Sequence, residues 1–196
     1  MTLVADTQAL IELDLTDPNF SKLAKESGRI AALLRLPVVQ GEVRIVGCLD
    51  DLLGAVYCLV FATITKFGDR HGPIERDKVL IRAEAVSRGS VRTDGKWMAG
   101  FHLNSAMYRL SATYDRILKT VTDVSGDLAA MRNAAEKQFN WKSKNIRGIH
   151  GQVTALKHDR RGAHDGRRRD AGLENAYGAV GELLSLTEAW ACKKGC

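Results

Sequence analysis

The stretch EVRIVGCLDDLLGAVYCLVFATITKF, residues 42–67, decides the fold class. Its apolar residues recur every three or four positions, which is the spacing of a helix face. The stretch is apolar almost all round, as is typical of a helix at the centre of a bundle. Its uncharged part, residues 52–65, is shorter than the roughly 18 residues of a membrane span, so we expect a buried core helix. The positions in register are Val43, Val46, Leu49, Leu53, Val56, Val60 and Ile64.

The same spacing runs through most of the remaining chain, and the alternation typical of β-strands is nearly absent. Further helices are expected over residues 20–34, 74–87, 101–122, 127–139 and 173–191. Asp127 is placed to cap one of them. Helices joined by short connections predict an all-α fold, an antiparallel up-and-down helical bundle. Two stripes should face the core: Leu103, Met107, Leu110, Tyr114, Ile117 and Val121 in the first, and Ala176, Val180, Leu183, Leu184 and Trp190 in the second.

The 196 residues fit a single domain with a sizeable core. We expect the core bundle over residues 42–192, with residues 1–41 as an N-terminal helical extension packed on it. The acidic, interrupted opening MTLVADTQALIELDLTD does not resemble a secretory signal, which favours the cytoplasm. The four cysteines are then expected to be reduced, with Cys48 and Cys58 as small apolar residues of the core helix.

The net charge of +6 is concentrated in one part of the chain. Between residues 142 and 169, nine Lys or Arg residues are opposed only by Asp159 and Asp165, so the rest of the chain sums to −1. A local concentration of this kind is typical of a phosphate-binding surface, although a solvated loop has the same composition. The nine are Lys142, Lys144, Arg147, Lys157, Arg160, Arg161, Arg167, Arg168 and Arg169.

The helix expected to carry these residues changes character along one face. At 100° per residue, an apolar stripe of Ile146, Ile149, Val153 and Leu156 continues into Arg160, Ala163 and, at its margin, His164. A charge on a core-facing stripe is costly unless it is paired or the stripe has emerged into a cleft or a partner. The alternative is that Gly162 ends the helix and leaves Arg160 and His164 in an exposed loop.

Three segments together resemble the HEPN superfamily of small helical-bundle proteins: YRLSATYDRILKTV (108–121), FNW (139–141) and LKHDRRGAHDG (156–166). That family carries an Arg and, a few residues later, a His near the end of one helix. Many members are metal-independent endoribonucleases, usually dimeric, of toxin–antitoxin or phage-defence systems. The resemblance covers residues 100–192. The family has four to six residues between the Arg and the His, whereas Arg160 and His164 are separated by three.

The resemblance implies a metal-independent endoribonuclease with Arg160, His164 and His158 as catalytic residues. A histidine can take or give a proton near neutral pH, and the arginine fork offsets the charge that develops on the phosphoryl oxygens. No cofactor is expected, and no metal, because Cys192 and Cys196 are loosely spaced and the three histidines at 150, 158 and 164 do not share a face. The expected RNA contacts are Arg147, His150, Lys157, Arg161, Arg167, Arg168 and Arg169.

The expected partners are RNA, an antitoxin or another protein, and a second copy of the chain in a homodimer; no membrane partner is expected. Two non-catalytic readings stay open. The basic stretch could bind the nucleic-acid backbone without cutting it, in a salt-dependent and sequence-independent manner. The protein could also be a helical interaction subunit whose basic edge meets an acidic protein.

Overall fold

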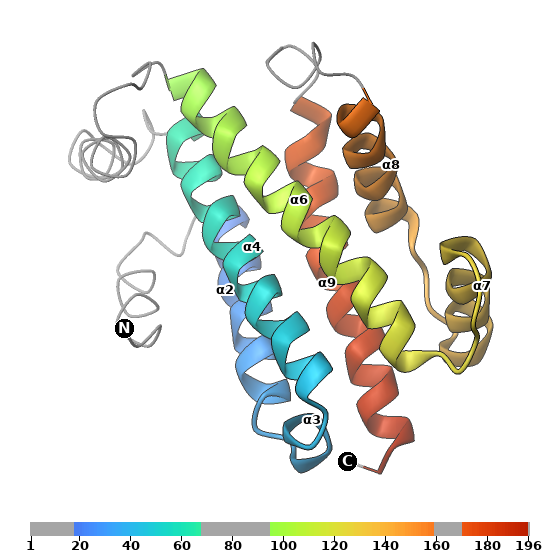
Figure 1. Cartoon of the computed structure of the whole chain (residues 1–196). Coiled ribbons are helices and arrows are strands. Elements are labelled where there is room, and N and C mark those ends of the chain that lie inside the picture. Colours follow the sequence, from blue (N-terminus) through green and yellow to red (C-terminus); the bar gives the residue numbers. More distant parts are fainter. Residues whose placement is uncertain (1–17, 68–94, 159–169, 196) are drawn as a thin grey trace.

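The computed structural model describes residues 18–67, 95–158 and 170–195, and it has no strand within those ranges. The all-α helical bundle predicted from the periodicity is confirmed (Figure 1). The expected helix over residues 74–87 lies outside the described residues. The helices in the described ranges are α2 (Pro18–Leu33), α3 (Pro37–Gln40), α4 (Val43–Phe67), α6 (Gly95–Val121), α7 (Leu128–Phe139), α8 (Lys144–His158) and α9 (Asp170–Lys193).

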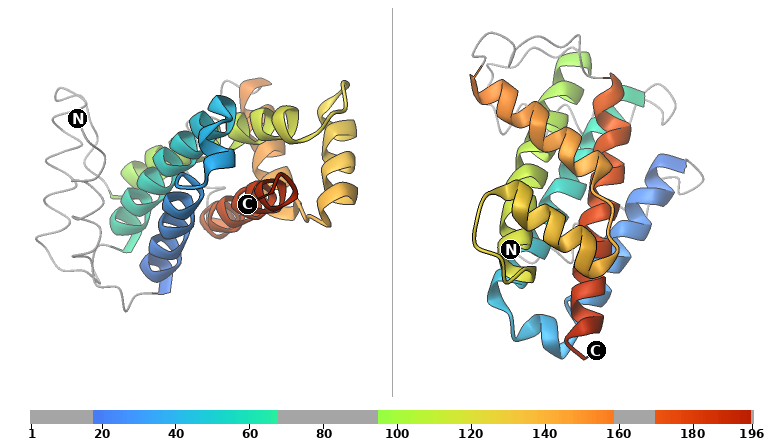
Figure 2. Two further views of the ribbon diagram at one scale, coloured as in Figure 1. Left: turned by 90° about the horizontal axis from the view of Figure 1, so that it is seen from below. Right: turned by 90° about the vertical axis from the view of Figure 1, so that its right-hand side faces the viewer.

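The long helices run alternately up and down (Figures 1 and 2). Helices α4 and α6 form one antiparallel pair, and α8 and α9 form a second pair that packs against α6. Helix α2 lies across α4 and α9, and the short α7 stands at the side, where it touches α6 and α9. Helices α4 and α8 therefore end, and α6 and α9 begin, at the same end of the bundle.

The two apolar stripes expected to face the core are confirmed. All six predicted positions of α6 are buried, as are all five of α9. Asp127 is the N-cap of α7, with its side chain accepting a hydrogen bond of 2.7 Å from the backbone N–H of Ala130. Helix α6 begins earlier than expected, at Gly95. The prediction succeeded for these helices because each has one continuous apolar face, and only that face can pack against the core.

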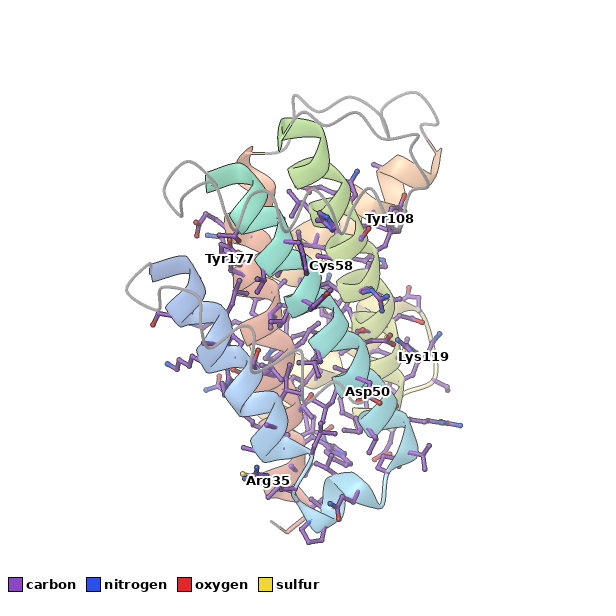
Figure 3. All side chains as sticks on the ribbon, turned by 90° about the vertical axis from the view of Figure 1, so that its left-hand side faces the viewer. Arg35, Asp50, Cys58, Tyr108, Lys119 and Tyr177 are labelled. Atoms are coloured by element: carbon purple, nitrogen blue, oxygen red, sulfur yellow. The ribbon has the colours of Figure 1, made fainter. Side chains whose placement is uncertain are left out.

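The expectation that residues 42–67 form the central helix is wrong in part. Leu49, Val56 and Val60 are buried as predicted, but Val43 is 80% exposed, and Val46 and Leu53 are only half-buried. The reason is that α2, α6 and α9 pack against one side of α4, and the side chains on its opposite side are less covered (Figure 3). By length and composition the stretch Val43–Thr63 of α4 could cross a membrane, and half of it is buried inside the protein.

Glu182 of α9 fixes the start of α8. One carboxylate oxygen accepts from the backbone N–H of Asn145 at 3.0 Å and from its side-chain amide at 2.8 Å. The other accepts from the backbone N–H of Ile146 at 2.8 Å. The first N–H groups of a helix have no partner within it and favour a negative charge. In addition, Trp141 Nε1 donates to the backbone carbonyl of Glu182 at 2.6 Å, so the whole α7–α8 corner is tied to α9.

Replacing Glu182 by Ala should therefore release the start of α8. We expect a loss of about 2 kcal/mol in the free energy of unfolding, because hydrogen bonds to a charged group are lost. Amide hydrogen exchange should accelerate in residues 144–150 more than in α4. Glu174→Ala, an exposed position of the same helix, is the matched control, and equal exchange of α8 in both variants would contradict the cap.

Candidate functional site

Helix α8, which the sequence identified as the functional helix, has a buried side and an exposed basic side. Ile146 and Ile149 are fully buried and Val153 is 1% exposed, so the predicted stripe is confirmed at three of its four positions. The side chain of Leu156 lies outside the described part of the helix. The buried side packs on α6 and α9, which directs the opposite side away from the bundle.

The outward side of α8 carries positive charge without opposing acid. Its sequence, KNIRGIHGQVTALKH, contains Lys144, Arg147 and Lys157 and no Asp or Glu. Lys144 and Arg147 are exposed, and neither forms a salt bridge with a described residue. Gly148 and Gly151 follow Arg147 in the same helix, and both are exposed. The result is a flat, cationic helix surface.

His150 lies at the border between this surface and the core. Its Nδ1 is 2.9 Å from Oγ of Ser111, a buried residue of α6. Its ring meets the ring of Tyr114 edge-on, with 5.6 Å between the centroids. Its backbone carbonyl accepts a hydrogen bond of 2.9 Å from Oγ1 of Thr154. The imidazole is therefore held in a fixed orientation, half-buried in the seam between α6 and α8.

Tyr114 brings a second titratable group to the same seam. Burial raises the pKa of its phenol to about 12, and the nearby charges act in both directions: Arg132 and Arg147 lower it, whereas Glu136 and Glu182 raise it. The phenol is thus protonated throughout the physiological range. The charges that act on it come from three helices, with two of each sign: Arg132 and Glu136 of α7, Arg147 of α8 and Glu182 of α9.

The three predicted catalytic residues are not placed by the described structure. Arg160 and His164 lie outside the described residues, as do the predicted RNA contacts Arg161 and 167–169. His158 and Lys157 belong to the last turn of α8, but their side chains lie outside the description. Of the predicted RNA contacts, the structure brings Arg147 and His150 onto adjacent parts of one helix face.

The structure also contains an ionic cluster that the sequence did not indicate. Asp51 of α4 pairs with Arg116 of α6 and lies 3.5 Å from Nη1 of Arg109. Asp115, the neighbour of Arg116 in the chain, pairs with Lys119 at 2.6 Å. Asp51 thus links α4 to α6 with one negative charge against two arginines, so we assign the cluster a structural role.

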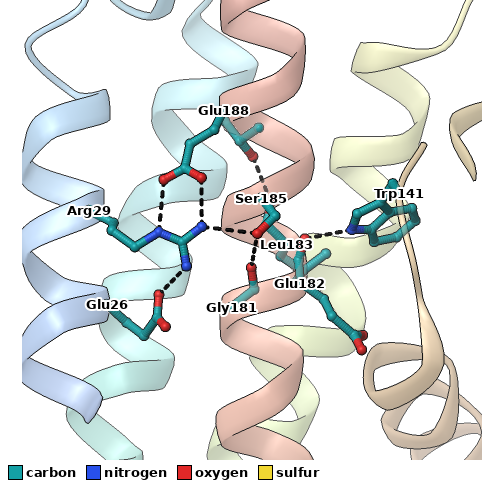
Figure 4. A network of polar contacts seen from close by, with 9 residues as sticks. Glu26, Arg29, Trp141, Gly181, Glu182, Leu183, Ser185 and Glu188 are labelled. Carbon is teal, nitrogen blue, oxygen red and sulfur yellow. Dashed lines mark hydrogen bonds and ion pairs between the residues drawn. The ribbon is translucent and has the colours of Figure 1, made fainter. Parts of the chain in front are cut away.

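A second feature missed by the sequence is a groove beside α9. It has a volume of about 440 Å³ and lies between α2, the middle of α9 and the α7–α8 corner. Its wall is built around Arg29, which donates to both carboxylate oxygens of Glu188 at 2.8 and 2.6 Å. The same guanidinium donates to Glu26 at 2.6 Å and to Ser185 Oγ at 3.0 Å (Figure 4). The hydrogen bond with Glu188 is the main reason that the pKa of Arg29 is raised.

Arg29 should contribute to stability through this planar, branched contact. We expect Arg29→Ala to lower the free energy of unfolding by about 2 kcal/mol. Arg29→Lys should recover less than half of that loss, because one ammonium cannot bridge both carboxylates and the serine. Urea unfolding followed by circular dichroism measures both changes.

The control for this pair is Arg35→Ala. Arg35 is an exposed arginine at the far end of α2 (Figure 3), where a change within about 0.5 kcal/mol is expected. A lysine at position 29 that stabilised the protein as well as arginine does would overturn the branched-contact explanation.

Among the described side chains, no three His, Cys, Asp or Glu residues come together in an arrangement that could hold a metal ion. Cys192 is exposed near the end of α9, and Cys196 lies outside the described residues. The chain matched no model of a protein family, no curated protein and no solved structure in our comparisons.

Proposed function

We propose that the protein is a HEPN-like, metal-independent endoribonuclease that binds RNA along the outward face of α8. The observation that carries the proposal is the unopposed charge of this helix. Lys144 and Arg147 are exposed there without a salt bridge to any described residue, and the chain continues from α8 into the arginine-rich residues 160–169. Phosphate groups are the ligands that such a surface attracts most strongly.

The two exposed glycines of α8 support the same proposal. Glycine within a helix costs about 1 kcal/mol relative to alanine. A Cβ added at Gly148 or Gly151 would meet nothing within 4 Å, so the packing of this chain does not require either glycine. Their effect is to leave the helix backbone open to a close approach from outside, which suits a polynucleotide backbone lying along α8.

The proposed chemistry needs a base, an acid and a group that offsets negative charge. One histidine, His164 or His158, takes the proton of the RNA 2′-hydroxyl, whose oxygen then attacks the adjacent phosphorus atom. The bond from phosphorus to the 5′-oxygen breaks, and the other histidine returns a proton to that oxygen. Arg160 offsets the charge on the phosphoryl oxygens. The products are a 2′,3′-cyclic phosphate and a 5′-hydroxyl.

The biological setting that we propose follows from the family resemblance alone. It is a cytoplasmic homodimer of a toxin–antitoxin or defence system, in which an antitoxin or other protein partner opposes the activity. Two-fold symmetry would bring two Arg–His pairs to one cleft. A non-catalytic protein that binds nucleic acid or an acidic protein through the same face is the second candidate, favoured by the three-residue spacing of Arg160 and His164.

Cleavage is tested by incubating the purified protein with end-labelled RNA in EDTA. We expect cyclic-phosphate ends from the wild type, and loss of at least 100-fold in rate for His164→Ala and for Arg160→Ala, in line with the usual contribution of such groups. Arg35→Ala is the control for loss of an arginine elsewhere and should cut normally. Cleavage that survives both site substitutions would contradict the assignment.

Binding is measured with the same RNA in gel shifts at several salt concentrations. Arg147→Glu should weaken binding and reduce the slope of log affinity against log salt by about 1 for each lost phosphate contact. Binding without cleavage would favour the non-catalytic candidate. If neither cleavage nor binding occurs, RNA is not the ligand of this face.

A further inference from the structure

The groove beside α9 is a hollow with a fixed shape. Its floor is α9 at Gly178 and Gly181, which the side chains of Asn145 and Glu26 approach closely. One wall is α2, held by Arg29, and the other is the α7–α8 corner, held by Trp141 through its hydrogen bond to the carbonyl of Glu182 (Figure 4). Both walls are tied to the floor by hydrogen bonds of 2.6 Å. A groove restrained in this way does not need to reorganise to accept a ligand.

The acids at the groove are already engaged within the protein. Glu26 pairs with Arg29 at 2.6 Å, and Glu188, just beyond the groove, takes two further donors of the same guanidinium. Glu182 has both carboxylate oxygens on the start of α8. None of these carboxylates pairs with the lysines that line the groove.

Those lysines, Lys22 and Lys142, lie on opposite walls, one from α2 and one from the α7–α8 corner. Both are exposed, and neither forms a salt bridge with a described residue. The Nζ of Lys22 lies 5.7 Å from the centre of the Tyr177 ring. The lining thus carries three cations, Lys22, Arg29 and Lys142, against the carboxylates of Glu26 and Glu182, and the two ammonium groups without a salt bridge come from opposite walls.

The groove also offers apolar surface and polar groups of low charge. Phe139 contributes a half-buried aromatic ring to its lining, whereas the rings of Trp141 and Tyr177 beside it are 7% and 1% exposed. Asn140 lies between two of them, in a left-handed conformation with φ of 48°, and adds an amide that can donate and accept. Aromatic surface with a few placed polar groups and a charge is the usual composition of a small-molecule site, and about 440 Å³ falls in the usual size range.

We infer that this groove binds a planar organic anion of the size of a nucleoside monophosphate, with its anionic group between Lys22 and Lys142 and its ring against the aromatic lining. A carboxylate or phosphate meets two ammonium groups without a salt bridge there, and a flat ring meets the half-buried Phe139 at the corner. The ligand is a free nucleotide or a terminal nucleotide of an RNA, which share this chemistry. The described residues that line the groove do not include a proposed catalytic residue, so the two sites are proposed independently.

The full-length protein is titrated with adenosine 5′-monophosphate and, in parallel, with adenosine and with inorganic phosphate. Binding is followed by calorimetry and by the NMR signal of the Trp141 indole N–H. We expect the monophosphate to bind at least about 10-fold more tightly than either fragment, because only it uses both the charge and the ring contacts. The Trp141 signal should shift on binding, whereas that of the distant Trp190 should not.

Charge reversal then identifies the groove. Lys22→Glu and Lys142→Glu should each weaken binding by about 10-fold or more. Lys25 of α2 and Lys137 of α7 are exposed and lie outside the groove lining. The variants Lys25→Glu and Lys137→Glu carry the same change in net charge, so they should bind the monophosphate as the wild type does. Equal weakening in all four variants would overturn the inference. It would also be overturned if neither the monophosphate, at millimolar concentration, nor a 5′-phosphorylated tetranucleotide RNA bound.

A 5′-phosphorylated tetranucleotide distinguishes the two sources of the ligand. Tighter binding of this RNA than of the monophosphate, lost in the Lys22 and Lys142 variants, supports an RNA end as the ligand. Equal or weaker binding supports a free nucleotide. Because the His164→Ala variant leaves the groove intact, it should bind the monophosphate normally even if it cuts no RNA, so the two proposals can fail separately.

Discussion

The packing of the other helices on α9 is the constraint on which the structure depends. Helices α2, α4, α6, α7 and α8 all contact it, so α9 has to be narrow as well as apolar. Its sequence meets this need with Gly and Ala at close contacts: Ala176 and Ala179 are fully buried, and a Cβ on Gly178 would come within 2.4 Å of the Asn145 amide. Larger residues at these positions would force the surrounding helices apart.

Polar groups of α9 then hold the outer helices in place. Glu188 binds Arg29 of α2, and Glu182 binds the start of α8, so two acids of one helix set the positions of elements on its two sides. This use of acids has an electrostatic consequence. The carboxylates near the groove and near α8 are engaged inside the protein, which leaves exposed lysines and arginines in excess on both surfaces. The basic character of this part of the molecule is therefore a product of its folding as well as of its composition.

The two proposed ligands use these surfaces differently. The outward face of α8 is flat and open, which suits a long backbone bound by charge. The groove is concave and partly aromatic, which suits a single flat group. Lys142, just before α8, belongs to the groove, whereas Lys144 and Arg147 belong to the face. The basic stretch that the sequence presents as one region thus contributes to two surfaces of distinct shape.

The sequence by itself determined the helices, the buried stripes of α6, α8 and α9, the cap at Asp127 and the local excess of positive charge, because each depends on neighbours within a few residues. Only the tertiary structure decided that α9 rather than α4 is the shared helix, that Arg109 and Arg116 share Asp51 as a partner, and that a groove lies beside Arg29. Arg29 and Glu188 are 159 residues apart in the chain. Periodicity cannot identify such a pair, because it records which face of a helix is buried but not which helix covers it.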